Sequence, residues 1–74
     1  MTNVQFYLVD IHEEFDRATK RHGSFRSPHE GYAVLKEEVD EMWDAIKAND
    51  LDSARKEAIQ VAAMALRFLV DVTE

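Results

Sequence analysis

Carboxylates gather on one side of a stretch that otherwise has the pattern of a helix. The segment Glu37-Glu38-Val39-Asp40-Glu41 lies inside this stretch. An apolar repeat with the period of an amphipathic helix runs through it and consists of Leu35, Val39, Met42 and Ile46. On such a helix Glu38 and Glu41 flank the apolar stripe, whereas Asp40 points to solvent. Like charges three residues apart repel one another. A hard divalent cation, Mg²⁺ or Mn²⁺, would remove this conflict because it prefers carboxylate oxygens.

A further acidic residue stands in the next helical pattern, where it is costly to bury. Glu57 extends a stripe that continues with Val61, Met64 and Phe68, and a carboxylate there requires a cation or a base beside it. A short turn makes two successive helices antiparallel neighbours. We therefore expect Glu57 to face Glu41, with Gln60 one turn further along. Facing acidic pairs in a helical bundle are a recurrent way to hold divalent metals.

Three helices are expected to position these residues. Periodic apolar residues predict helices from about Asn3 to Arg21, from Pro28 to about Ala48, and from Leu51 to Val72. No segment has the alternation of a strand, so the predicted class is all-α, with residues 1–74 forming one domain.

Capping residues support these boundaries. Ser27 precedes Pro28 at the first helical position, and Glu30 can complete a capping box with Ser27. Gly23 supplies a stop for the first helix. The other candidate N-caps are Thr2 or Asn3, and Asp50 or Asp52.

Composition limits the classes of function. The chain has 74 residues, no cysteine and a formal net charge of −6, which argues against binding to a nucleic acid polymer. Basic residues nevertheless cluster at the end of the first predicted helix and beyond it: Arg17, Lys20, Arg21 and Arg26. No apolar run is long enough for a bilayer span, and the N-terminus lacks the pattern of a signal peptide. We expect a cytoplasmic protein without a membrane partner.

The third predicted helix is apolar on nearly all sides. Residues off its main stripe that still need cover are Ile59, Ala62, Ala63, Leu66 and Val70. Two other short helices cannot cover such a helix completely, and a domain of this size has a marginal core. We expect a second copy of the chain to complete a four-helix type of bundle, as a homodimer or a dimer of dimers.

The acidic pattern resembles that of the MazG-like family of all-α nucleoside triphosphate pyrophosphohydrolases. The family pattern is E-E-x-x-E on one helix and E-x-x-D on the next. The chain matches it with Glu37-Glu38-Val39-Asp40-Glu41 and Glu57-Ala58-Ile59-Gln60. The resemblance covers about His29 to Phe68. Gln60 departs from the pattern, because its carbonyl oxygen can bind a metal but brings no charge, which leaves the number of metals open.

This resemblance implies hydrolysis of an NTP or dNTP to the monophosphate and pyrophosphate, with house-cleaning of nucleotides as one role. It implies that Mg²⁺ or Mn²⁺ is bound by Glu38, Glu41, Glu57 and Gln60, and that Glu37 activates the water. Candidate substrate contacts are Lys36, Arg55, Lys56, Arg67 and Trp43. The basic residues among them are also compatible with ordinary surface charges, and Trp43 with helix packing.

A second class of function fits the same sequence. Gln60 and the short chain are also compatible with a helical interaction module that has the family scaffold and little or no catalysis. The histidines His12, His22 and His29 lack the spacing of a metal-binding pair, and we interpret them as structural.

Overall fold

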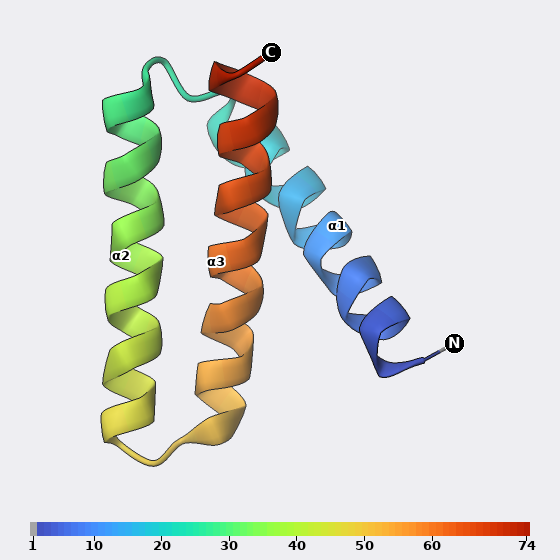
Figure 1. The fold of residues 1–74 in the computed structure, drawn as a ribbon, viewed down its shortest axis with the longest axis vertical. Coiled ribbons are helices and arrows are strands. Elements are labelled where there is room, and N and C mark those ends of the chain that lie inside the picture. Colours follow the sequence, from blue (N-terminus) through green and yellow to red (C-terminus); the bar gives the residue numbers. More distant parts are fainter. Residues whose placement is uncertain (1) are drawn as a thin grey trace.

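The computed structural model describes residues 2–74 and shows three helices (Figure 1). They are α1 (Asn3–His22), α2 (Pro28–Lys47) and α3 (Leu51–Val72). No strand occurs among the described residues. The predicted all-α class is confirmed, and each helix begins and ends within one residue of the position expected from its caps and periodicity.

The start of α2 differs in one detail from the expected capping box. Ser27 Oγ accepts a hydrogen bond of 3.1 Å from the Glu30 backbone N–H, as expected of an N-cap. The Glu30 carboxylate does not return to Ser27 but accepts from the Arg26 backbone N–H at 2.9 Å and from the Arg26 guanidinium. The predicted hydrogen bond from the Ser27 backbone N–H to the Glu30 carboxylate is therefore wrong, because Arg26 binds this carboxylate instead. A complete box is formed instead at α1, between Thr2 and Gln5.

The turns between helices use positive φ angles where the chain reverses. Gly23, directly after α1, has φ 72°, which suits a residue without Cβ. Asn49, after α2, has φ 58°, a conformation that asparagine tolerates better than most residues. Asp50 then caps α3 by accepting from the Ser53 backbone N–H at 3.1 Å.

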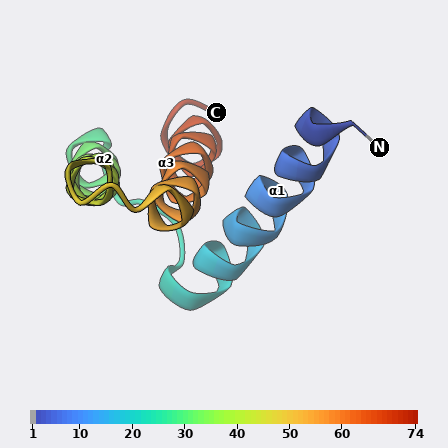
Figure 2. The same cartoon turned by 90° about the horizontal axis from the view of Figure 1, so that it is seen from below.

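The helices α2 and α3 lie antiparallel along most of their length, whereas α1 is splayed (Figure 1). From Ile11 onward α1 packs against the rest of the molecule, with Ile11 and Phe15 next to the core. Within residues 2–74, α1 contacts α3 and not α2, and its N-terminal half diverges from α3 (Figure 2). The arrangement leaves an open angle between α1 and the α2–α3 pair.

The core lies where the end of α1, the loop and the C-terminal half of α3 meet. Its buried members are Ala18, Phe25, Ala63 and Met64. Phe25 belongs to the loop between α1 and α2, and its backbone N–H donates to the Asp71 carboxylate at 2.9 Å. The buried Phe25 ring and this hydrogen bond thus help to fasten the loop onto α3.

Gly31 explains how α2 comes so close to this core. A Cβ atom at Gly31 would lie 2.7 Å from Phe68 Cδ2 and 3.2 Å from Phe25 Cδ2. Glycine in a helix costs about 1 kcal/mol relative to alanine. A glycine is nevertheless required here, because only a residue without Cβ leaves room for the two aromatic rings.

Some apolar side chains are covered by the rest of the chain, whereas others stay exposed to solvent. Ala63, which the helical pattern placed on the uncovered side of α3, is fully buried within the chain at 0% exposure, so that part of the expectation was wrong. Large apolar side chains remain exposed on all three helices, including Val4, Phe6, Leu8, Tyr32, Trp43 and Leu69. In the described part of the chain, no helix combines the length and apolarity that a membrane span requires.

Candidate metal centre

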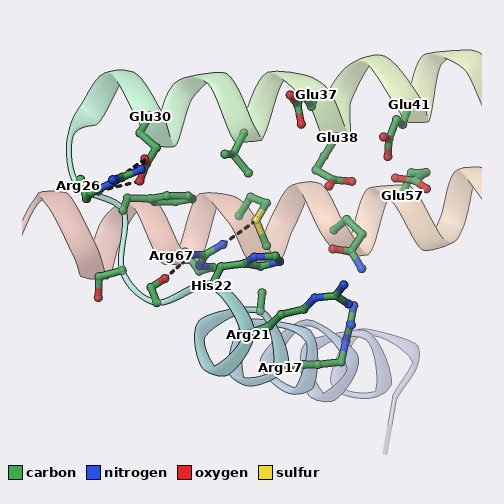
Figure 3. A pocket seen from close by; sticks show the side chains of 17 residues that line it. Arg17, Arg21, His22, Arg26, Glu30, Glu37, Glu38, Glu41, Glu57 and Arg67 are labelled. Atoms are coloured by element: carbon green, nitrogen blue, oxygen red, sulfur yellow. Dashed lines mark hydrogen bonds and ion pairs between the residues drawn. The ribbon is translucent and has the colours of Figure 1, made fainter.

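Three predicted ligands converge between α2 and α3. Glu38 and Glu41 project from α2 and Glu57 from α3, and each offers an oxygen atom such that these atoms all lie within 4.8 Å of one another (Figure 3). The i, i+3 spacing on α2 and the antiparallel approach of α3 bring them together. Oxygens bound to one Mg²⁺ lie about 4.2 Å apart or less, because each is about 2.1 Å from the metal, so a single cation could contact all three after small side-chain movements.

The electrostatics of the trio reflect three acidic groups in one place. Partial burial, hydrogen bonding to Glu57 and the neighbouring charges raise the pKa of Glu38 to about 7. Hydrogen bonding to Glu57 and its charge raise the pKa of Glu41. A hydrogen bond between two carboxyl groups requires a shared proton. The metal-free cluster therefore holds a proton at a pH at which isolated glutamates are ionised.

One carboxylate oxygen of Glu57 has no partner to offset its loss of hydration. Glu57 Oε2 is buried and accepts no hydrogen bond, although burying an unpaired carboxylate oxygen is costly. An acidic cluster at a helix surface is common by itself. An oxygen without a partner can be satisfied by a hydrogen-bond donor or by a cation bound directly to it, and three carboxylates in one place favour a cation. The residues present thus fit Mg²⁺ or Mn²⁺.

The two other residues expected at this centre also lie near it. Gln60 is half-buried and, like the exposed Glu37, lines the cavity that contains the trio. Gln60 can offer a carbonyl oxygen from α3. Figure 3 shows Glu37 on α2, one turn before Glu41, at the rim of the cavity and not between the helices. Its carboxylate is available to a water molecule at the edge of the metal centre.

The cavity beside the trio has a volume of about 870 Å³ and opposite charges on its two sides. The α2–α3 side carries the carboxylates. The other side carries basic side chains from the last turns of α1 and from the loop: Arg17, Arg21, His22 and Arg26. Figure 3 shows Arg17 and Arg21 rising from α1 toward the α2–α3 pair. The volume falls within the range of about 300–1,000 Å³ typical of small-molecule sites.

Arg67 is the one predicted substrate contact that lines this cavity. Its side chain is buried at 2% exposure, donates to the Gly23 carbonyl oxygen at 2.6 Å and lies 4.2 Å from the centre of the Phe25 ring. It therefore anchors the loop as well as contributing charge. It forms no ion pair with a carboxylate of residues 2–74.

The other four predicted substrate contacts lie elsewhere. Lys36 pairs with Asp40 at 2.9 Å and Arg55 with Asp52 at 3.2 Å, both outside the cavity. Trp43 is exposed, with the Lys47 ammonium 5.7 Å from its ring centre. Lys56 lines a separate, shallower depression next to Glu14. The structure thus does not bring these side chains to the carboxylate trio.

Sequence reasoning missed the cations that the structure does bring to the cavity. Arg17 and Arg21 are four residues apart and so share a face of α1, a signal visible in the sequence. The direction of that face depends on the tilt of α1, which the sequence pattern does not report. Glu14 was also missed. It is buried at 8% exposure and forms an ion pair with Arg17.

The fold and the site together define a helical protein with a carboxylate centre between two antiparallel helices and a charged cavity beside it. Comparison of the chain with protein-family models, with curated proteins and with solved structures finds no match. The function is therefore inferred from the residues themselves and from the motif they form.

Proposed function

We propose that the protein is a cytoplasmic, divalent-metal-dependent pyrophosphohydrolase that converts a nucleoside triphosphate to its monophosphate and pyrophosphate. The observation that carries this proposal is the convergence of Glu38, Glu41 and Glu57 from two helices, with a buried Glu57 oxygen that has no partner. The resemblance of the acidic motif to the MazG-like pattern supplies the reaction class.

Each residue of the centre has a definite role in this proposal. Glu38, Glu41 and Glu57 hold the metal, and Gln60 adds a neutral oxygen. When bound, Mg²⁺ or Mn²⁺ supplies neutralisation of phosphate charge and a template for the reacting groups. Glu37 orients the water and accepts its proton as the α–β anhydride bond breaks and pyrophosphate leaves.

The decisive experiment is product analysis. The purified chain is incubated with each NTP and dNTP in Mg²⁺ or Mn²⁺, and the products are separated by ion exchange. We expect monophosphate and pyrophosphate in equal amounts, and no turnover in EDTA. Release of orthophosphate with diphosphate, or no turnover of any nucleotide, contradicts the proposal.

Variants connect the reaction to the site. Glu38→Gln and Glu57→Gln should lower kcat/KM by at least about a hundredfold, because ligands of a catalytic metal affect affinity and rate together. Asp40→Asn is the matched control. It removes a carboxylate of the same helix that pairs with Lys36 outside the cavity, and it should change kcat/KM less than about twofold.

Gln60 favours a second candidate, a helical interaction module without catalysis. In place of the acidic residue of the family pattern, Gln60 offers no charge to a metal, and the neighbouring Glu41 is exposed. Calorimetry with Mn²⁺ separates the two functions. Micromolar binding that is lost in Glu41→Gln supports the enzyme, and an absence of binding supports the module. Gln60→Asp should tighten binding on either view.

Self-association is part of this proposal. The apolar stripe of α1 continues past the point where α1 leaves α3. Ile11, Phe15 and Ala18 pack against the core, whereas Val4 and Leu8 of the same stripe are 65% and 58% exposed. A second copy of the chain would cover these residues and complete a four-helix type of bundle. The stripe of α1 is thus better placed at the subunit contact than α3 alone.

A further inference from the structure

The cavity contains basic side chains that form no ion pair with a carboxylate. Two of the arginines on its basic side are paired, Arg17 with Glu14 and Arg26 with Glu30. Arg21 and His22 form no ion pair and no side-chain hydrogen bond within the described chain. Both line the cavity at the end of α1, where they are accessible to a ligand.

The buried side chain of Arg67 adds a positive charge to the same cavity. Arg67 lines the same cavity and is 2% exposed, yet its partners are a carbonyl, a thioether and an aromatic ring. Its Nε atom is buried without a hydrogen-bond partner. A buried cation without a counter-ion is costly, and its field acts through a medium of low dielectric constant. An anion in the cavity would offset that cost.

We propose that Arg21, His22 and Arg67 form a polyphosphate subsite that binds the terminal phosphates of the substrate, while the anhydride to be cleaved lies at Glu38, Glu41 and Glu57. This inference rests on the proposed function and adds the direction of the substrate in the cavity. Arg21 and His22 contact the phosphate oxygens. Arg67 supplies a fixed positive charge and holds the loop beneath them.

The separation of the two sides fits an extended anion. Arg67 lies about 15 Å from Glu57 along the axis of α3, at about 1.5 Å per residue. The long side chains of Arg67 and Arg21 shorten the distance between their guanidinium groups and the carboxylate trio. The carboxylate trio repels any phosphate that is not neutralised by a metal, whereas the basic side attracts it. The two fields together orient the phosphate chain, and the subsite should favour triphosphates over monophosphates.

A binding experiment without hydrolysis tests the subsite. The Glu38→Gln/Glu57→Gln variant in EDTA has less carboxylate repulsion and no metal centre, so only the basic side remains to hold an anion. Tripolyphosphate, pyrophosphate and orthophosphate are titrated into it by calorimetry at about 0.1 M salt. Affinity should fall in that order, because each additional phosphate group makes further charge-assisted hydrogen bonds.

Substitutions on the basic side show whether these residues carry the binding. In the same background, Arg21→Ala should weaken tripolyphosphate binding about tenfold or more, His22→Gln should weaken it by less, and Arg21→Lys should restore part of the loss. Arg55→Ala is the matched control, since Arg55 pairs with Asp52 outside the cavity. Circular dichroism verifies that each variant is folded.

The outcomes separate the subsite from the reaction. Tripolyphosphate binding that depends on Arg21 supports the subsite even if no nucleotide is hydrolysed. If the native chain hydrolyses nucleotides, Arg21→Ala should raise KM about tenfold with a smaller change in kcat. Unchanged KM and unchanged tripolyphosphate affinity in Arg21→Ala, or equal effects in Arg55→Ala, overturn the subsite and leave the reaction untouched.

Discussion

At the scale of single residues, the dominant feature is the crowding of Glu38, Glu41 and Glu57. Each could be an ordinary surface glutamate by sequence alone. Burial and the neighbouring Glu57 raise the pKa values of Glu38 and Glu41, and one oxygen of Glu57 is buried without a hydrogen-bond partner. We therefore expect the stability of the protein to depend on pH and, if the proposed function holds, on divalent cations.

The metal-free protein should lose stability as the pH rises from about 5 to 8. The pKa of Glu38 in the folded chain is about 7 against an ordinary value of 4.5. Between these values the folded chain binds more protons than the unfolded chain, so the free energy of unfolding decreases as the pH rises. Glu41 contributes in the same direction. Urea unfolding in EDTA measures the slope.

A matched variant isolates the contribution of Glu38. In Glu38→Gln the decrease between pH 5 and 8 should become clearly shallower, and excess Mn²⁺ should reduce it in the native chain. Glu30 and Asp50 cannot produce the effect, because their pKa values are lowered and act at more acidic pH. An equal slope in Glu38→Gln and the native chain would show that the cluster does not hold the proton.

At the scale of elements, the close approach of α2 to α3 sets the geometry of the candidate metal centre. Gly31 lets the two helices meet near the loop, where Phe25 and Phe68 fill the space beside it. Any widening there would displace α2, and with it Glu38 and Glu41, from Glu57 on α3. The glycine therefore affects the site from a distance of several helical turns.

Gly31→Ala should destabilise the protein despite the higher helix propensity of alanine. The added Cβ would lie 2.7 Å from the Phe68 ring, and such overpacking costs about 1–3 kcal/mol against a gain of about 1 kcal/mol from propensity. We expect a net loss of about 1 kcal/mol or more in urea unfolding, and weaker Mn²⁺ binding.

The reverse substitution at a neighbouring site provides the comparison. Ala33 is exposed on α2, so Ala33→Gly should lower stability by about 1 kcal/mol through propensity alone and leave Mn²⁺ binding unchanged. Stabilisation of the protein by Gly31→Ala would mean that the aromatic rings move aside freely and that α2 is not held close by them.

At the scale of the whole molecule, the chain is a pair of helices with a third helix that is only half supported. α1 contacts α3 near the loop and then diverges from it (Figures 1 and 2). The divergence opens the charged cavity and at the same time leaves the first half of the α1 stripe without cover. One geometric feature thus links the proposed substrate cavity to the proposed self-association.

Self-association should depend on the exposed half of the α1 stripe. Leu8→Glu would place a charge in the contact, where burial of a leucine side chain contributes about 1.5–3 kcal/mol, and it should shift the protein to monomers of lower thermal stability. Lys20→Glu, at an exposed position of the same helix about 120° around the axis from Leu8, should leave the assembly intact. Sedimentation equilibrium at micromolar concentration measures both. A native chain that is a folded monomer under these conditions refutes the assembly.

The amino-acid sequence by itself determined the helices and the carboxylate trio. Helix boundaries depend on local signals, such as Ser27 before Pro28 and Asp50 before α3, and these act in the same way in any tertiary context. The meeting of Glu38, Glu41 and Glu57 follows from helical spacing and from a turn too short for any arrangement except antiparallel neighbours.

Only the tertiary structure decided which cations face the carboxylates. The tilt of α1 depends on contacts between residues far apart in sequence: the Phe25 amide with Asp71, and the Arg67 guanidinium with the Gly23 carbonyl. These contacts hold α1 so that Arg21 and His22 line the cavity, whereas Lys36 and Arg55 pair with carboxylates of their own helices outside it. Periodicity reports which residues share a helix face, but the direction of that face is set by what the helix packs against.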